Sequence, residues 1–242
     1  MKNSIFLLIT VIFISCSKEE GKDSNLENYL NLNTIDQEND VIACAASKKT
    51  DDQTTFIFFY PIPGAANIKY FETEDATVNP NDFSLYQQVS LPKENVFNGY
   101  LQRFVKNSEK EVWCIVTYTV GEKLRTSNPI RLKNKTKSTE WTDTVGINSN
   151  QVTKPKFSWQ DGLHDDNEIY FQVVSDNNGD LLSGTYTYEK WFQYYELGNV
   201  VLNVTRETPP QLVLNNSYSF TMMGVSIDNW VNLVIQKDFQ IK

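Results

Sequence analysis

The sequence predicts an all-β protein that consists of two β-sandwiches in tandem. Hydrophobic residues make up 40% of the 242-residue chain and aromatic residues 13%, which indicates a globular protein and favours sheets over helices. Short apolar runs, separated by turns rich in Pro, Gly and Asn, recur from residue 41 to the end, as expected for the strands of a sandwich. The chain is also long enough for two domains of ~100–150 residues each.

The N-terminal segment has the pattern of a signal peptide. Lys2 is followed by an apolar run over residues 5–14 and then by Ser15 and Cys16. A charged start, a short apolar run and a small residue before the cleavage point define such a leader. A membrane-spanning helix needs about 20 apolar residues, so this run is too short to be one. We therefore expect residues 1–15 to be removed.

The end of this leader, Phe13-Ile14-Ser15-Cys16, resembles a bacterial lipobox, with Phe13 where that family usually has Leu. The resemblance implies that Cys16 becomes the mature N-terminus and is acylated. Several acyl chains, at ~0.8 kcal/mol per buried methylene, would make attachment to the membrane practically irreversible. The alternative is an ordinary secretory signal with an incidental cysteine.

Residues 17–20, Ser-Lys-Glu-Glu, look like the charged export signal of Bacteroidetes-type surface lipoproteins. This resemblance implies a lipid-anchored protein of the outer membrane that is exposed at the cell surface, with the periplasmic face as the alternative. The lipid anchor would then make the membrane a partner of the chain.

Residues 16–40 are expected to form a polar tether with one helical piece. The tether is rich in Ser, Asn, Asp and Glu, which favours a solvated chain. A Ser-x-x-Glu capping box begins at Ser24, and the apolar residues that follow share one helical face. Because a two-turn helix cannot persist alone, we expect this face to pack against the fold. The residues of the face are Leu26, Tyr29 and Leu30.

Residues 41–133 form the first predicted domain. Its apolar runs differ in strength: residues 81–91 hold only a weak strand, whereas residues 111–120 alternate cleanly between apolar and polar positions. The expected strands are 41–46, 54–60, 68–71, one within 81–91, 96–105 and 111–120.

The turn after the second of these strands carries a family resemblance. Phe59-Tyr60-Pro61-Ile62-Pro63-Gly64-Ala65 resembles the B–C corner of fibronectin type III domains, with Phe59 where the family usually has Trp. Residues 111–133 resemble the F–G hairpin of the same family, including a bulge at residues 127–130 that lets a proline sit on an edge strand. The resemblance implies a fibronectin-III-like, or immunoglobulin-like, sandwich in which strand F points four side chains inward. These are Val112, Cys114, Val116 and Tyr118.

Residues 134–152 lose the strand pattern and are interpreted as a linker that has room for the first strand of the next domain. Residues 153–242 form the second domain, which loosely repeats the first. Trp159 occupies the B-strand position and residues 168–176 have the pattern of strand C. Asn178-Gly179 between two strand-like runs predicts a type I′ hairpin.

The end of the second domain resembles the fibronectin type III family as well. Tyr218 follows Leu212 by six residues, which is the spacing of the tyrosine corner in that family. Residues 230–241 would then form the last strand. The whole chain is thus expected to hold two fibronectin-III-like sandwiches in series.

Composition argues against nucleic-acid binding and against the common catalytic chemistries. The net charge is −8 and the isoelectric point is near 4.8, and an acidic surface repels phosphate backbones. His164 is the sole histidine of the sequence and lies in a loop-like stretch, so the usual catalytic triads and His-rich metal sites cannot be assembled. We expect no catalytic residue, no metal and no cofactor.

Two cysteines remain for the folded domains. Cys44 and Cys114 would lie on strands A and F of the first domain, in an oxidising compartment. They could form a disulfide only if Cys44 points inward, and two buried thiols are the alternative.

The first domain is expected to carry an apolar outer face. The run over residues 56–60 has no polar position, and if Ile57 and Phe59 fill the core, its other side chains must point outward. In the strand 96–105, an inward register for Leu101 and Val105 would turn two more aromatic side chains outward. The predicted face is Phe56, Phe58, Tyr60, Tyr100 and Phe104.

Soluble monomers rarely leave an aromatic patch of this size uncovered, so something is expected to lie on it. We favour the amphipathic helix after Ser24, folded back as a lid, because this helix otherwise lacks a partner. The second domain or another protein is the alternative.

The function expected from location and from missing catalytic chemistry is a non-catalytic binding or scaffold module, with a protein or glycan partner that the sequence does not identify. The alternative is a glycan-binding accessory lipoprotein of an outer-membrane sugar-uptake system. Its candidate residues are aromatic and could stack on sugar rings, and packing of alternate members in the core is the competing interpretation. They are Trp191, Phe192, Tyr194 and Tyr195.

Overall fold

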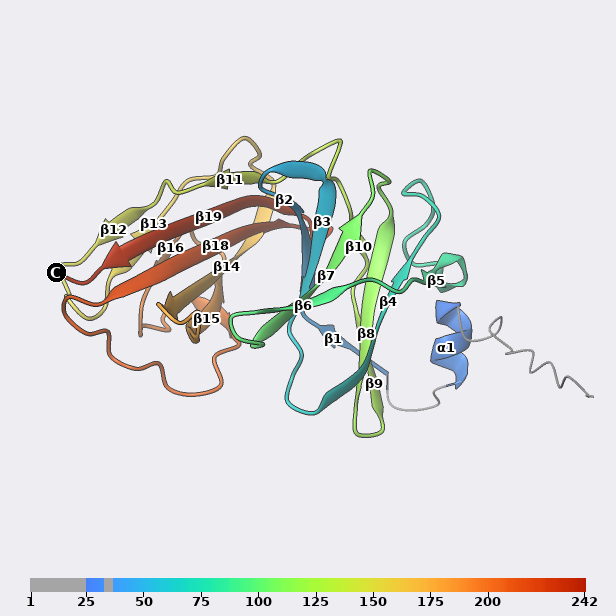
Figure 1. The fold of residues 1–242 in the computed structure, drawn as a ribbon, viewed down its shortest axis with the longest axis horizontal. Helices are drawn as coiled ribbons and strands as arrows, with labels where there is room; N and C mark the ends of the chain where they lie inside the picture. Colours follow the sequence, from blue (N-terminus) through green and yellow to red (C-terminus); the bar gives the residue numbers. More distant parts are fainter. Residues whose placement is uncertain (1–24, 33–36) are drawn as a thin grey trace, which may run out of the picture.

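The computed structural model describes residues 25–32 and 37–242. The molecule is elongated, with helix α1 (Leu26–Leu32) near one end of the long axis and the C-terminus at the other (Figure 1). The predicted signal peptide, Cys16 and the start of the predicted tether lie outside the described residues. The rest of the described chain is almost entirely β-structure, arranged as two sandwiches side by side along that axis.

The first domain is a sandwich of two sheets. One sheet has the order β1-β9-β8-β4-β5, with β10 paired to β8, and the other has the order β2-β3-β7-β6. Strands A, B and E on one sheet and C, F and G on the other is the arrangement that fibronectin-III-like sandwiches share. The strands are β1 (Gln37–Val41), β2 (Ala43–Lys48), β3 (Asp51–Phe59), β4 (Ala65–Glu72), β5 (Gln87–Gln88), β6 (Lys93–Val96), β7 (Leu101–Asn107), β8 (Trp113–Val120), β9 (Lys123–Ser127) and β10 (Ile130–Arg131).

The core between these sheets confirms the inward positions that the sequence predicted. Phe59 is 1% exposed and fills the place expected of it on β3. At the corner that follows, Gly64 has a φ of 89° and the Ala65 N–H donates to the carbonyl of Ile62 at 3.0 Å. The predicted strand-F side chains Val112, Cys114, Val116 and Tyr118 are all in this core.

The expected strand 96–105 is wrong, because it is two strands joined by a turn. β6 ends at Val96 and β7 begins at Leu101, and the first three of the four residues between them, Phe97, Asn98 and Gly99, have φ values of 50°, 52° and 89°. The register with β3 pairs Ile57 with Phe104, and paired residues point to the same side of a sheet. Phe104 therefore lies in the core rather than on the predicted outer face.

The second domain is a sandwich of a large and a small sheet. The large sheet has the order β11-β19-β18-β14-β15-β17, and the small one has the order β12-β13-β16. Two of these strands, β11 and β12, fall within residues 134–152, so the predicted linker is shorter than expected. The strands are β11 (Glu140–Thr142), β12 (Gly146–Asn148), β13 (Lys156–Ser158), β14 (Asn167–Asp176), β15 (Leu181–Thr187), β16 (Trp191–Gln193), β17 (Val200–Asn203), β18 (Ser217–Ser226) and β19 (Val231–Gln240).

The hairpin predicted at Asn178-Gly179 joins β14 to β15, but its turn is not of type I′. A type I′ turn needs positive φ at both central residues, and here Gly179 has a φ of 83° while Asn178 does not have a positive φ. The Asp176 carboxylate instead accepts hydrogen bonds from the N–H groups of Asn178 and Asp180, both at 2.9 Å. This carboxylate holds a four-residue loop, which explains the different turn.

The predicted tyrosine corner is present at the end of the second domain. The Tyr218 side chain is 6% exposed, and its hydroxyl accepts a hydrogen bond from the Val213 N–H at 2.9 Å. This contact fixes the segment next to Leu212, whose side chain lies in the core of the domain.

Helix α1 is confirmed, but its cap and its partner differ from the expectation. Asn25 is the N-cap, since its side-chain oxygen accepts from the Asn28 N–H at 3.2 Å and its carbonyl accepts from the Tyr29 N–H at 2.9 Å. The apolar side of the helix packs on the outer face of the β4–β8–β9 sheet, against Phe71 and Ile115 among others. The prediction that this helix covers the outer face of the β2–β3–β7–β6 sheet is therefore wrong.

Candidate functional site

The predicted apolar face of the first domain is the interface between the two domains. Phe56, Phe58 and Tyr60 are between 5% and 8% exposed and share one core cluster with side chains of the second domain. The alternative cover, the second domain, is the correct one. The buried side chains opposite are Phe171, Val173, Tyr186, Val204, Met223, Val225, Val231 and Val234.

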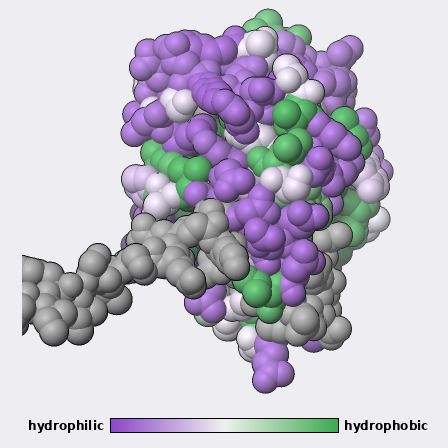
Figure 2. Space-filling view, turned by 90° about the vertical axis from the view of Figure 1, so that its right-hand side faces the viewer, coloured by the Kyte–Doolittle hydropathy of each residue, from purple (hydrophilic) through white to green (hydrophobic). Residues whose placement is uncertain are grey.

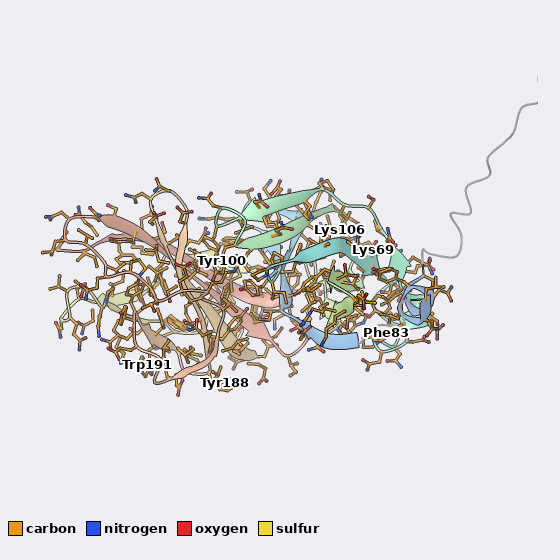
Figure 3. All side chains as sticks on the ribbon, turned by 90° about the horizontal axis from the view of Figure 1, so that it is seen from below. Lys69, Phe83, Tyr100, Lys106, Tyr188 and Trp191 are labelled. Atoms are coloured by element: carbon orange, nitrogen blue, oxygen red, sulfur yellow. The ribbon has the colours of Figure 1, made fainter. Side chains whose placement is uncertain are left out.

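The polar rim of this interface is closed by hydrogen bonds. The Tyr100 hydroxyl donates to the carbonyl of Val204 at 2.8 Å and accepts from the Arg206 N–H at 2.6 Å. The rings of Tyr60 and Tyr100 are stacked at 5.8 Å, with the Arg206 guanidinium 4.3 Å from the Tyr100 ring. Burial raises the pKa of Tyr100. Figure 3 shows Tyr100 at the junction of the two domains.

A second connection is made by Trp230 at the tip of the β18–β19 hairpin. The side chain is fully buried in the core cluster of the first domain, and its Nε1 donates to the carbonyl of Lys137 at 2.7 Å. Next to it, the Ala45 N–H donates to the carbonyl of Asn229 at 3.0 Å. The second domain therefore contributes a core residue to the first, which joins the two sandwiches into one body.

The two cysteines of the first domain are free thiols, so the disulfide alternative is wrong. Cys44 packs against the interdomain cluster, whereas Cys114 lies inside the first sandwich, and the β2–β3–β7–β6 sheet separates them. Burial raises the pKa of Cys44 to about 12 and that of Cys114 further still. Neither thiol is activated as a nucleophile.

A buried ion pair in the first domain is a feature that the sequence did not indicate. Lys106 Nζ lies 2.9 and 2.7 Å from the two carboxylate oxygens of Glu72, which also accepts from the Tyr70 hydroxyl at 2.7 Å. Lys106 and Glu72 connect β7 of one sheet to β4 of the other. Because the hydrogen bonds occupy these groups, the pair is part of the core rather than a site.

The aromatic run of the second domain is divided between core and surface. Phe192 and Tyr194 are 1% and 0% exposed and belong to the core, whereas Trp191 is half-buried and Tyr195 is exposed. On β16, Phe192 pairs with Phe157 of β13 and Trp191 pairs with Ser158, so alternate residues face opposite sides. Half of the predicted stacking residues thus remain available at the surface. In Figure 3, Trp191 lies on the outside of the second domain, away from the junction at Tyr100.

Trp191 lies beside a groove that runs along the small sheet of the second domain. The groove consists of two adjoining hollows of about 570 and 330 Å³. The first hollow covers the outer face of β12, β13 and β16, and the second opens toward β11 and β19. Four residues line both: Gly146, Ser158, Trp159 and Gln160.

The charges at this groove are unevenly paired. Lys190 forms an ion pair with Asp161, and Lys154, at the edge of the same face, forms one with Glu196 at 2.8 Å. Lys156 has no carboxylate partner among the described residues, and its Nζ lies 3.8 Å from the centre of the Trp191 ring. The groove thus combines one unpaired cation with one accessible aromatic ring.

Trp159 lines both hollows, while its ring belongs to the core cluster of the second domain. Trp159 is 3% exposed, and its Nε1 has no acceptor within the described part of the chain. At the junction of the hollows, a Cβ on Gly146 would lie 2.8 Å from the Ser158 hydroxyl, so glycine keeps this passage open. Sequence reasoning missed Gly146, Ser158 and Gln160 because single polar or small residues in strand ends carry no recognisable pattern.

Within residues 25–32 and 37–242, no three His, Cys, Asp or Glu side chains are grouped so that they could hold a metal ion. In the same part of the chain, no helix has the length and apolar character needed to cross a membrane. The groove offers hydrogen bonding, stacking on Trp191 and the cation of Lys156, beside the Lys190–Asp161 ion pair and the Glu140 carboxylate, which accepts from the Leu163 N–H at 2.6 Å.

No family model and no curated protein matches the sequence. Among solved structures, a two-domain fibronectin type III segment of chicken tenascin is 10% identical and covers 83% of this chain and 97% of that chain, with a TM-score of 0.32. The FN1–FN3 domains of chicken CNTN1 are 13% identical over 85% of this chain and 65% of that chain, with a TM-score of 0.29. A laminaripentaose-producing β-1,3-glucanase from Paenibacillus barengoltzii is 10% identical over 78% and 50%, with a TM-score of 0.30.

Proposed function

We propose that the chain is a lipid-anchored protein of the outer membrane, exposed at the cell surface, whose two joined sandwiches serve as a non-catalytic binding or scaffold module. The observation that carries this proposal is the separation, along the long axis of the molecule, between the point where the chain enters the fold and the groove. The chain enters the fold at α1, at one end, and the groove lies on the second domain toward the other (Figures 1 and 3). An acylated Cys16 would thus attach the first domain and leave the second domain free to meet a ligand.

The interface between the domains supports this role. Trp230 and the apolar face formed by Phe56, Phe58 and Tyr60 are buried at the interface between the domains. The second domain therefore cannot rotate freely about a linker. The end of the molecule that carries α1 is largely hydrophilic, with small hydrophobic patches (Figure 2), so attachment there would depend on the lipid.

Replacement of the lipidated residue tests the anchor. A Cys16→Ala variant should lose acyl labelling and leave the membrane fraction, while the matched variant Cys44→Ala keeps both properties. Digestion of intact cells by an added protease should remove the wild-type protein if it faces outward. A Cys16→Ala protein that stays labelled and membrane-bound would contradict the anchor, and full protection in intact cells would move the protein to the periplasmic face.

Assays with common glycoside and peptide substrates test the non-catalytic part of the proposal. We expect no turnover, because the thiols of Cys44 and Cys114 have raised pKa values and the described residues contain no metal-binding cluster. Turnover that disappears when a single carboxylate is replaced would show that the chain is an enzyme.

A second candidate is a glycan-binding accessory lipoprotein of a sugar-uptake system. It is favoured by the accessible rings of Trp191 and Tyr195, each of which has a lysine ammonium over it, at 3.8 and 5.1 Å. Binding of the full mature chain to a glycan array tests it. Retained glycans should be lost by a Trp191→Ala variant and kept by Tyr188→Ala, which removes an exposed ring that does not line the groove. An empty array would reject this candidate without affecting the anchor.

A further inference from the structure

We propose that the groove binds an acidic sugar, a pyranose with a carboxylate, whose C–H face stacks on Trp191 and whose carboxylate pairs with Lys156. The proposal rests on the glycan-binding candidate above and names the class of glycan. Its starting point is the position of the Lys156 ammonium, 3.8 Å from the centre of the Trp191 ring.

The indole face attracts partial positive charge, whether this comes from an ammonium or from the polarised C–H bonds of a sugar. In the free protein, Lys156 takes this place on Trp191. A sugar that stacks on the same face must displace the ammonium. A neutral sugar offers the displaced ammonium only hydroxyl acceptors, whereas a carboxylate offers an ion pair with stronger, charge-assisted hydrogen bonds. The exchange therefore favours an acidic ligand.

The surrounding charges leave Lys156 available for this role. The neighbouring cations Lys190 and Lys154 are held by Asp161 and Glu196, so their charges are compensated. Lys156 has no such partner among the described residues, on a chain whose net charge is −8. An uncompensated cation in the groove of an acidic protein gives an anionic ligand a place to bind there.

The rest of the groove supplies neutral hydrogen-bond groups suited to sugar hydroxyls. Ser158 and Gln160 are exposed side chains that line both hollows, and each can donate and accept. Trp159 lines both hollows, and its buried Nε1 has no acceptor among the described residues. A few polar groups beside an aromatic wall are typical of small-molecule sites.

Calorimetric titration of the detergent-solubilised full mature chain tests the proposal with a pair of matched probes. The probes are oligogalacturonate and the same oligosaccharide with its carboxylates methyl-esterified. We expect the acid to bind and the ester to bind at least about tenfold more weakly, since esterification removes the ion pair and leaves the stacking face intact. Equal affinity for acid and ester would overturn the proposal.

Two variants connect the binding to the named residues. Trp191→Ala should weaken binding of the acid by about tenfold or more. Lys156→Gln should bring the affinities for acid and ester together, which a merely structural role of Lys156 would not do. Tyr188→Ala and Lys93→Gln, which change an exposed ring and an exposed cation away from the groove, should leave both affinities unchanged.

A third variant tests the passage without removing any polar group. Gly146→Val adds a side chain where even a Cβ would lie 2.8 Å from the Ser158 hydroxyl, so it should block the acid. Unchanged binding in Trp191→Ala or Gly146→Val would overturn the location. No binding of oligogalacturonate, oligoalginate or hyaluronan fragments would overturn the acidic-sugar class, while neutral glycans retained on the array would keep the glycan-binding candidate.

Discussion

The chain has two aromatic runs, residues 56–60 and residues 191–195, which look alike in the sequence. They differ in how far the folded protein buries them. Every residue of the first run is at most 8% exposed, because alternate side chains fill the first sandwich and the interface with the second domain. In the second run, alternate side chains fill the core and the others face the groove or solvent. The first run is structural, and the second is the better candidate for binding.

The difference follows from the position of each strand in its sheet. β3 lies between β2 and β7 and has a covered sheet face on both sides. β16 is the edge strand of a three-stranded sheet whose outer face is open. A continuous apolar run is typical of a strand buried on both faces, whereas a polar residue within the run, here Gln193, marks a face that remains wet.

Removal of Trp230 should have the largest effect, because this residue belongs to the sequence of one domain and the core of the other. Trp230→Ala leaves a cavity and frees the carbonyl of Lys137, so we expect a loss of about 3–5 kcal/mol in the free energy of unfolding. Chemical denaturation of the full chain measures it. A loss below about 1 kcal/mol would mean that the two sandwiches are stable independently of this contact.

Matched substitutions in the two runs compare them directly. Phe58→Ala removes a ring that is 5% exposed and should cost roughly 3 kcal/mol. Trp191→Ala removes a half-buried ring that contacts the Lys156 ammonium. It should lower the free energy of unfolding by less than about 1 kcal/mol. Urea denaturation of both variants provides the measurement, and similar losses would remove the distinction between interface and groove.

The rim of the interface should contribute less than its apolar centre. Tyr100→Phe keeps the ring that stacks on Tyr60 but loses the hydroxyl that donates to Val204 and accepts from Arg206. We expect a loss of about 1 kcal/mol because the carbonyl of the buried residue Val204 and the N–H of the exposed residue Arg206 each lose a hydrogen bond. The control Tyr188→Phe changes an exposed side chain and should leave the midpoint of thermal unfolding unchanged. Equal midpoints in all three proteins would contradict a closed rim.

The smallest effect on stability is expected from the ionisation of the two thiols, which does not change the free energy of unfolding near neutral pH. Burial raises the pKa of Cys44 from 9.0 to about 12, so the native protein holds its proton more tightly than the unfolded chain. This stabilisation is complete below pH 9 and is lost as the pH rises toward 12. At pH 8, iodoacetamide should modify Cys44 and Cys114 slowly in the native protein and rapidly in urea, as measured by mass spectrometry. Rapid native labelling would place Cys44 on an open surface.

The local part of the fold could be predicted from the sequence, whereas the contacts between distant segments could not. Alternation and turn residues were enough for most strands, helical periodicity predicted α1, and the resemblance to fibronectin type III domains implied the core position of Phe59. The β6–β7 turn was missed although Asn98-Gly99 is a hairpin signal. Because residues 96–105 were taken as one strand, the predicted outward orientation of Phe104 was wrong as well. The burial of Phe58 against the second domain depends on how two surfaces fit, which no local pattern records.

The groove was only partly visible in the sequence for the same reason. Trp191 and Tyr195 had a signal, since they belong to a run of aromatic residues at a strand end, where rings could stack on sugars. Phe192 and Tyr194 were counted with them because the strand parity at β16 could not be fixed without its partner β13. Gly146 and Trp159 reach the same place from separate segments, so their neighbourhood is a product of the fold.

Hydrogen–deuterium exchange of the full mature chain, free and with saturating oligogalacturonate, tests the contrast between the two runs most directly. Residues 54–60 should exchange slowly in both states, because β3 is paired on both sides and the interface covers its outer face. Residues 146–148, 156–160 and 190–193 should exchange faster in the free protein and become protected when the ligand binds. Fast exchange over residues 54–60 in the free protein, or ligand protection there instead of at the groove, would contradict this account.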